Sequence, residues 1–300
     1  MLLVGANTIG TEDASSGKDY VEVPRKAVEA GTATLGGSIA YWVGDEGVKI
    51  SMIGYDDFST ASNTVPSASL MRLDPAYVSA AYTPDVDATL KVNAFEQLKL
   101  VKSNIPWSSN FHVATVTAFS VADGLPRGAR LSRYKTWRNG TITALMVSGG
   151  FSANSTNAEV WEAACYLAAQ NLGLGLPGET RRENFASEML SGIKSEGPFL
   201  DLTSFANSTT LANAIGRLAT PRPTPTDFVA SLEPLLQPRS DTFRIRAYGD
   251  AIDPLDGTVL SKAYCEAIVQ RTPEVIDSAN GTLGRRFVIT YFRWLGPDDI

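Results

Sequence analysis

The most regular alternation of apolar and polar residues lies in the C-terminal part of the chain. The segments 243–248, 264–269 and 287–292 each repeat with a period of two, and turn-rich stretches separate them. Alternate residues of a β-strand point to opposite faces, so this period is typical of strands. The pattern predicts a three-stranded antiparallel meander, although the middle segment is short enough that a helix is the alternative there.

The period of two also assigns the side chains of this meander to faces. Phe243 and Ile245 share one side of the first strand, and Phe287 and Ile289 share one side of the third. We expect these four side chains to face one core. The substitution Ile245→Ala would then cost about 2–5 kcal/mol of stability.

Basic residues alternate with the apolar ones in the first of these strands. Arg244 and Arg246 are expected to face Glu266 on the neighbouring strand. A cross-strand pair of opposite charge contributes well under ~1 kcal/mol, so we expect these contacts to be minor.

A second β-rich region lies near the N-terminus. The runs 39–43 and 48–52 flank the cluster Gly44–Gly47, whose Gly and Asp residues accept the backbone angles of a tight turn. This arrangement predicts a β-hairpin. Asp45 and Glu46 would stand at its tip, where side chains are normally solvated. The alternative is a catalytic carboxylate pair, but adjacent side chains in a strand or turn tend to diverge.

Helical patterns occupy the middle of the chain. Asn157 is expected to cap a helix whose apolar residues recur at steps of three and four up to Leu172. A shorter helix is expected over 183–193. The proline-rich stretch 221–225 predicts an extended connector, and Asp227 is expected to cap a last short helix that Pro234 helps to end.

These elements predict an α+β chain with a helical insertion between two β regions. We divide it into an N-terminal hairpin and irregular region (1–155), a helical insertion (156–220) and a C-terminal antiparallel meander (226–300). Residues 54–110 show weak patterns and are expected to form loop with short helical pieces.

Composition and charge narrow the functional classes. Hydrophobic residues make up 44% and charged residues 19% of the 300 residues, which is ordinary for a globular protein. The formal net charge of −6 gives no electrostatic basis for binding a phosphate backbone, so no nucleic-acid partner is expected. No apolar stretch approaches the roughly 18 residues needed to span a bilayer, and no secretory signal is visible.

Two patterns associated with catalysis or cofactors have unfavourable contexts. His112 is the only histidine, which excludes a multi-histidine zinc site and favours a structural or surface role. Gly173–Gly178 matches G-x-G-x-x-G, but it follows a predicted helix, whereas a dinucleotide site follows a strand and opens a helix. We therefore expect a helix stop and a turn, and no catalytic, cofactor-binding or metal-binding residue.

The two cysteines are far apart in sequence. Cys165 falls in a helical pattern and Cys265 in a strand pattern. They are expected to be packed thiols, although a disulfide between them is the alternative.

Acidic residues cluster in the predicted loop from Asp250 to Gly257. Asp250, Asp253 and Asp256 could ligate Ca²⁺, which takes several oxygen ligands, but their spacing is not that of an EF-hand. An ordinary Asp/Gly hairpin loop is favoured over a calcium site.

Several blocks of sequence carry a family resemblance. The segments 40–49, 197–200, 240–249, 263–271 and 284–295 resemble the Verru_Chthon cassette protein A family, a group of bacterial pilin-like envelope proteins. The resemblance is spread over most of the chain but is poor between residues 54 and 150.

This resemblance implies a non-catalytic structural or assembly component of a pilus-like or type II secretion-like envelope system. It implies a pilin-like antiparallel sheet with a helical insertion, pilin-like or secretion-system proteins as partners, and a periplasmic or cell-surface location. We expect the chain to be a C-terminal fragment, attached to the membrane only through an apolar prepilin helix encoded upstream of Met1. Type II pseudopilins include calcium binders, which raises the prospect of calcium in the loop 250–257.

Two other functions are weaker alternatives. One is an extracellular carbohydrate- or protein-binding module that uses exposed aromatic residues such as Trp107, Tyr134 or Trp137. Such residues more often belong to a core. The other is an acidic-residue hydrolase built around Asp45 and Glu46.

Overall fold

The protein is described here from a computed structural model. The structure describes residues 1–9, 20–29, 36–51, 111–112, 114–115, 119–121, 134–139, 142–148, 151–232, 235–253, 255–277, 279 and 283–300. The region 54–110, predicted to be loop with short helices, lies outside the described residues, as does Trp107.

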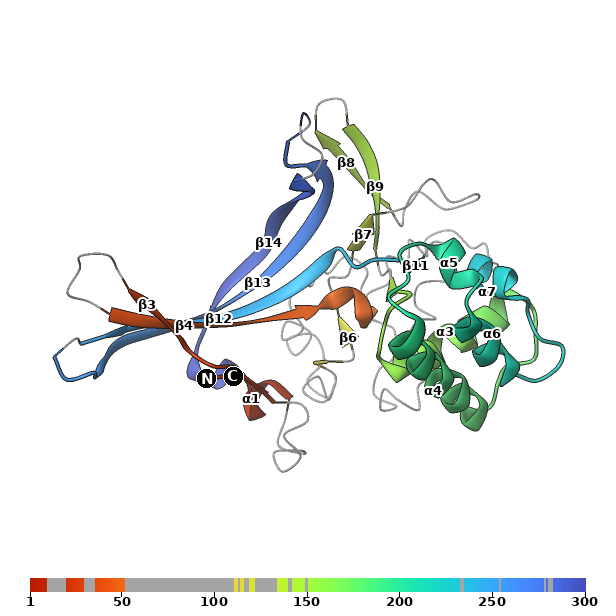
Figure 1. Cartoon of the computed structure of the whole chain (residues 1–300), viewed down its shortest axis with the longest axis horizontal. Helices are drawn as coiled ribbons and strands as arrows, with labels where there is room; N and C mark the ends of the chain where they lie inside the picture. Colours follow the sequence, from red (N-terminus) through yellow and green to blue (C-terminus); the bar gives the residue numbers. More distant parts are fainter. Residues whose placement is uncertain are drawn as a thin grey trace, which may run out of the picture.

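A five-stranded antiparallel sheet is the largest element, and the α+β class is confirmed. Its strand order is β14-β13-β12-β4-β3. The bounds are β3 Lys26–Glu29, β4 Gly36–Asp45, β12 Thr242–Ile252, β13 Val259–Val275 and β14 Arg285–Leu295. The sheet twists strongly, and β13 and β14 turn away from the plane of β3 and β4 (Figure 1).

The predicted meander is present as β12, β13 and β14. Consecutive strands pair antiparallel, with Thr242 opposite Gln270 and Tyr264 opposite Leu295. Each connection between these strands contains a glycine with positive φ, Gly257 (72°) and Gly284 (77°). These backbone angles favour glycine because it lacks a Cβ.

The predicted hairpin of 39–43 and 48–52 is wrong, because the two runs belong to different sheets. Strand β4 pairs with β3 and β12, whereas β5 (Ile50–Ser51) pairs in parallel with β6 (Ala114–Thr115). Gly44–Gly47 does not reverse the chain. The Asp45 side chain accepts a hydrogen bond of 2.8 Å from the Gly47 N–H and so starts a 3₁₀ turn, η1 (Glu46–Val48).

Helices follow β10 (Phe151–Ser152) and form a separate layer beside the sheet (Figure 1). They are α3 (Ala158–Asn171), α4 (Glu179–Glu196), α5 (Leu202–Ala206), α6 (Thr209–Gly216) and α7 (Pro225–Ser231).

Local signals at the helix ends explain most of these bounds. Asn157 caps α3 as predicted, because its side chain accepts a hydrogen bond from the Glu159 N–H. The α4 helix is longer at both ends than predicted. Asp227 does not cap α7: Thr224 accepts the N–H of Asp227, and Pro225 occupies the first turn, where a missing N–H costs nothing.

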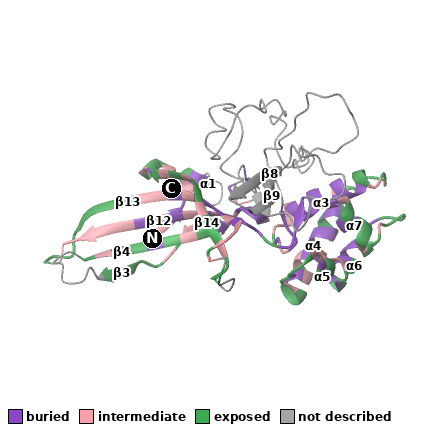
Figure 2. Ribbon diagram, turned by 90° about the horizontal axis from the view of Figure 1, so that it is seen from above, coloured by how far each residue is buried: buried purple, intermediate pink, exposed green. Residues whose placement is uncertain are grey.

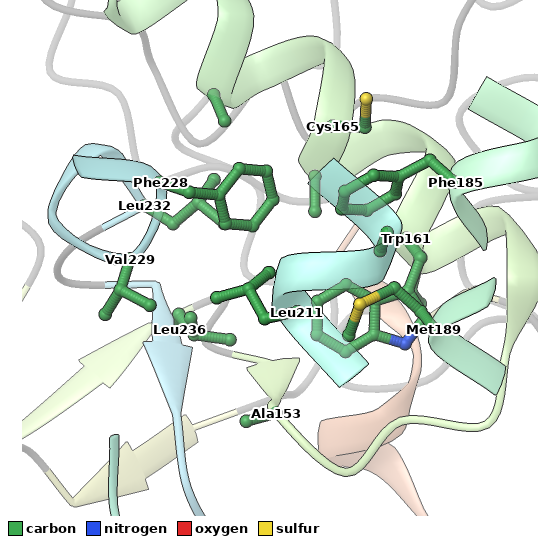
Figure 3. Close-up of a cluster of buried hydrophobic side chains, with 14 of the residues drawn as sticks. Ala153, Trp161, Cys165, Phe185, Met189, Leu211, Phe228, Val229, Leu232 and Leu236 are labelled. Atoms are coloured by element: carbon green, nitrogen blue, oxygen red, sulfur yellow. The ribbon is translucent and has the colours of Figure 1, made fainter. Parts of the chain in front are cut away.

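An apolar core holds the helices together. Trp161 from α3, Phe185 and Met189 from α4 and Leu211 from α6 converge in its centre, and all four are at most 1% exposed (Figure 3). The indole N–H of Trp161 donates to the Ser155 carbonyl at 2.7 Å, so its one polar group is satisfied.

Short strands complete the described structure. They are β1 (Leu2–Val4) with β2 (Val21–Glu22), β10 with β11 (Leu236–Gln237), and a sheet of β7 (Phe119–Val121), β9 (Ile142–Ser148) and β8 (Tyr134–Asn139). The parallel pair β10 and β11 leads from the helices into β12.

Both termini meet at the sheet (Figure 1). The Asn7 N–H in α1 (Ala6–Ile9) donates to the Ile300 carbonyl, and the Thr8 hydroxyl donates to the Asp299 carbonyl in η7 (Pro297–Asp299). The first and last residues thus belong to one structural unit with the sheet.

Candidate functional site

The two faces of the five-stranded sheet differ in chemistry. Even-numbered residues of β4, β12 and β13 point to one face, here called the inner face, and odd-numbered residues point to the other, the outer face. The register fixes this assignment, because Arg246 lies opposite both Trp42 and Glu266. Arg244, Arg246 and Glu266 are each at most 1% exposed, so the inner face is the buried one.

A network of buried charges begins at Glu46. Its carboxylate forms ion pairs with Nζ of Lys49 at 2.6 Å and with Nε of Arg244 at 3.1 Å. The hydroxyl of Thr115 donates to its other oxygen. The Lys49 ammonium also donates a hydrogen bond of 2.9 Å to the Phe111 carbonyl. The 3₁₀ turn η1 therefore serves to aim a carboxylate at the inner face.

Glu266 forms the second centre of this network. Its Oε2 contacts Nη1 of Arg244 at 3.2 Å and Nε of Arg246 at 2.8 Å. Its Oε1 contacts Nη2 of Arg293 at 3.1 Å. Arg244 thus bridges the two carboxylates. The predicted contacts of Arg244 and Arg246 with Glu266 are confirmed, and all three side chains are buried.

Arg246 joins the network to both ends of the chain. Its Nη1 donates to the Leu3 carbonyl, the Thr8 hydroxyl and the Asp299 carbonyl at 2.8–3.1 Å. The N-terminal segment, the C-terminal segment and β12 therefore meet at this guanidinium.

An aromatic ring covers the cations. The ring centroid of Phe111 lies 5.0 Å from Lys49 Nζ, 5.1 Å from Arg244 Cζ and 5.0 Å from Arg246 Cζ. His112 stands edge-on to Phe111 and Trp42, with ring centroids 5.1 and 6.1 Å away. His112 therefore packs against aromatic side chains, in keeping with the predicted structural role.

The surrounding charges keep both carboxylates ionised. Burial alone would raise the pKa of Glu46, but Arg244 and Lys49, with hydrogen bonds from Lys49 and Thr115, lower it to about 2. Burial acts likewise on Glu266, and Arg244, Arg246 and Arg293 lower its pKa to about 2. Burial raises the pKa of Asp45 in spite of the hydrogen bonds from Ser240 and the Gly47 N–H.

These contacts correct the prediction of a solvated hairpin tip. Glu46 is 0% exposed, and both of its oxygens are engaged by protein groups. A carboxylate that is enclosed and ionised in this way is suited to tie strands together, whereas a general acid or base must reach a substrate.

The outer face carries apolar side chains that solvent reaches. On β4, Ile39, Tyr41 and Val43 are 43%, 64% and 48% exposed. In Figure 2, β12 is less exposed than parts of β4 and β13 on either side of it. We call the outer-face patch the following residues of β4, β12, β13 and β14: Ile39, Tyr41, Val43, Phe243, Ile245, Ala247, Cys265, Ala267, Val269, Phe287, Ile289, Phe292 and Trp294.

The edge strand β14 supplies the most exposed residues of the patch. Phe287, Ile289, Phe292 and Trp294 are 55%, 62%, 48% and 69% exposed. The prediction that Phe243, Ile245, Phe287 and Ile289 share one face is confirmed, but the prediction that this face is a core is wrong. The arginines take the buried face because the buried carboxylates of Glu46 and Glu266 lie on that side.

The patch contains no charged side chain. Charged residues border it on several strands: Lys26 lies opposite Ile39, Asp45 opposite Phe243 and Arg271 opposite Phe287. Asp241 accepts hydrogen bonds of 2.7 Å from both Arg271 and Arg285. The hydroxyl of Thr290, at an irregularity of β14, is turned to the Ile268 carbonyl. The patch therefore offers dispersion contacts and hydrophobic burial and few hydrogen bonds.

The predicted glycine-rich turn lies beside a small pocket. Gly173 has a φ of 64° and ends α3, as expected for a helix stop. The pocket has a volume of about 260 Å³, and its lining residues are Ala169, Leu174–Gly178, Arg181, Leu218–Pro221 and Pro223. This lining has no pair of acidic and basic side chains suited to catalysis.

The acidic loop is held by hydrogen bonds within the protein. Asp250 accepts hydrogen bonds from Ser38, Tyr248 and Arg25, while Asp253 and Asp256 accept the backbone N–H groups of Leu255 and Thr258. Among the described residues, no three His, Cys, Asp or Glu side chains are grouped to hold a metal ion. Calcium binding by this loop stays a prediction.

Both cysteines are free thiols. Cys165 is buried in the helical core, which raises its pKa to about 12. Cys265 is half-buried in the outer-face patch.

Sequence reasoning missed the inward orientation of Arg244 and the exposure of the patch. The available signal was the alternation of arginine with bulky apolar residues in 243–248, which leaves open which of the two faces is buried. In the described part of the chain, no helix combines the length and hydrophobicity that a membrane crossing requires.

No family model matches the chain, and neither does any curated protein or solved structure.

Proposed function

We propose that this chain is a non-catalytic assembly component that binds a protein partner through its outer-face patch. The system is a bacterial pilus-like or type II secretion-like apparatus of the cell envelope, as the resemblance to Verru_Chthon cassette protein A implies. The observation that carries the proposal is an outer sheet face whose large apolar side chains stay exposed, while Arg244, Arg246 and Glu266 are buried on the inner face.

The size of the patch supports a docking role. Four of its five aromatic residues, Tyr41, Phe287, Phe292 and Trp294, are about half to two-thirds exposed. With roughly 150–250 Å² available per aromatic side chain, and with its aliphatic residues included, the patch offers roughly 700 Å². The largest apolar patch on a typical monomer covers about 300–600 Å², and larger ones mark interaction sites.

The buried network supports the same role by fixing the shape of the patch. Arg244 and Arg246 tie β12 to Glu46, to Glu266 and to both chain ends from behind. A surface whose backbone is already ordered loses less entropy on binding than a flexible one. The buried ion pairs on the inner face therefore hold the backbone under the outer-face patch in place before a partner binds.

The patch fits a protein partner better than a carbohydrate or nucleic acid. Carbohydrate sites combine aromatic platforms with hydrogen-bonding groups, and the Thr290 hydroxyl is already turned to a backbone carbonyl. Phosphate backbones require basic residues, which the patch lacks. A protein-binding module outside an envelope apparatus would use the patch in the same way and remains the alternative function.

Site-specific photo-cross-linking in the native bacterium tests this proposal. A photoreactive phenylalanine analogue replaces Tyr41 in the patch or, as a matched control, Leu200, which is 63% exposed between α4 and α5. We expect cross-links from position 41 to proteins of the envelope fraction and none from position 200. Equal cross-linking at both positions, or recovery of the chain outside the envelope fraction, would overturn the proposal.

A further inference from the structure

We propose that the partner seated on the outer-face patch is a second copy of this chain, packed face to face about a two-fold axis. This inference rests on the proposed docking role of the patch. It names the binding partner. Three properties of the patch indicate this partner: the arrangement of its large and small side chains, its area and its charge.

The surface shape of the patch is complementary to itself, because large side chains stand beside small ones. One row across the sheet reads Tyr41, Ala247, Cys265, Trp294, in the register of the four strands. In this row the large side chains stand on β4 and β14, and the small ones form a trough over β12 and β13. Ile245, Phe243 and Val269 of the same two strands close the trough at one end. Gly249 and Ala263 extend this trough toward the β12–β13 turn.

A second copy supplies a ridge that suits this trough. The walls β4 and β14 are three strand spacings apart, roughly 14 Å, which admits the side chains of one strand between them. Strand β14 is an edge of its sheet, so its aromatic ridge can enter the trough of the other copy without displacing a neighbouring strand. Each copy offers one ridge and one trough, so a two-fold axis satisfies both at once.

The twist of the sheet favours the same occupant. Two sheets pack face to face, about 10 Å apart and within about 30° of alignment, when their twists match. A second copy has the same twist and strand lengths. The patch residues themselves bear no charge. At the border, Arg271 is paired with Asp241, and Lys26 and Asp45 are the neighbouring charges on the β4 side.

The exposed area agrees with a stable dimer. A standard interface buries about 800 Å² on each partner. The roughly 700 Å² estimated for the patch approaches this value before any rim residue is included. A dimer of moderate affinity is therefore expected.

The first test is the mass of the purified chain in solution, measured by sedimentation equilibrium over a range of micromolar concentrations. We expect twice the mass of one chain. Tyr41→Ala combined with Trp294→Ala should weaken dimerisation by about tenfold or more, since central aromatic residues dominate interface energies. The control Leu200→Ala should leave it unchanged.

The second test uses a native thiol and needs no variant. Cys265 lies in the trough, whereas Cys165 is buried in the helical core. Alkylation of Cys265 by iodoacetamide should slow as the protein is concentrated into the dimer range, and Cys165 should stay unreactive throughout. A rate at Cys265 that does not depend on protein concentration would overturn the dimer.

The outcomes separate this inference from the proposed function. A monomer at all concentrations, with cross-links from position 41 to another envelope protein, overturns the dimer and supports the docking role. A monomer that binds phosphatidylglycerol vesicles through the patch overturns the dimer too. A dimer in solution without any envelope cross-link supports this inference and contradicts the assembly role.

Discussion

The helical region and the sheet region differ in what they mainly bury. The helices enclose Trp161, Phe185 and other apolar residues, and few of their charged residues are buried. The sheet encloses Arg244, Arg246 and Glu266 beside a few apolar side chains, and the large apolar side chains of its outer face reach solvent. The two regions of one chain therefore reach stability by different physical routes.

The difference has an energetic consequence. An apolar core gains free energy roughly in proportion to buried area, so each residue contributes its own share. A buried charge network offsets a large desolvation cost only when its members are all present. The sheet should therefore respond sharply to the loss of one charge, and weakly to the loss of apolar side chains on its outer face.

The largest effect is expected from Glu266→Gln. The change preserves shape but leaves Arg244, Arg246 and Arg293 with less compensation in a buried site. We expect a loss of about 3–5 kcal/mol in unfolding free energy, measured by urea denaturation. The control Glu188→Gln removes the more exposed contact with Arg217 in the helical region and should cost about 1 kcal/mol or less. Similar losses in both variants would remove the distinction between the two regions.

A matched pair of apolar truncations comes next. Leu211→Ala in the helical core, where the side chain is 0% exposed, should cost about 2–5 kcal/mol. Ile289→Ala in the outer-face patch, where the side chain is 62% exposed, should cost less than about 1 kcal/mol in the monomer. Urea denaturation at low protein concentration measures both. If Ile289→Ala were as costly as Leu211→Ala, the outer face would be a core after all.

Acid should weaken the sheet more than the helices. The pKa values of Glu46 and Glu266 are about 2 in the folded protein against an ordinary value of 4.5. Their contribution is therefore complete above pH 4.5 and is lost as the pH falls toward 2, because the unfolded chain takes up protons first. Hydrogen exchange at pH 6 and pH 3, about 4 and 1 units above the folded pKa, should show loss of protection in β12 and β13 before α3. Simultaneous loss in both regions would contradict the prediction.

The features that sequence predicted are those set by local residues. The alternation in 243–248 and 287–292 defined β12 and β14, and Asn157 with its following apolar residues defined the start of α3. The orientation of the sheet depended instead on Glu46 and Arg244, which are 198 residues apart. A period of two assigns side chains to faces but does not say which face is buried.

The site was less predictable than the fold for the same reason. Asp45 and Glu46 resembled a hairpin tip because β-rich runs flank them, yet the partners of the second run lie on β6. The outer-face patch joins residues from β4, β12, β13 and β14, and only the register of these strands brings Tyr41 and Trp294 into one row.

The central claim is that the sheet exposes its apolar outer face and buries its charged inner face. Hydroxyl-radical footprinting with mass spectrometry tests this claim most directly. In a dilute sample, Trp294 (69% exposed) and Tyr41 (64% exposed) should oxidise rapidly, while Trp161 (0% exposed) stays protected. Aromatic residues of similar intrinsic reactivity are thereby compared within one molecule. Protection of Trp294 and Tyr41 to the level of Trp161 in the dilute monomer would show that the apolar face is buried and contradict the assignment.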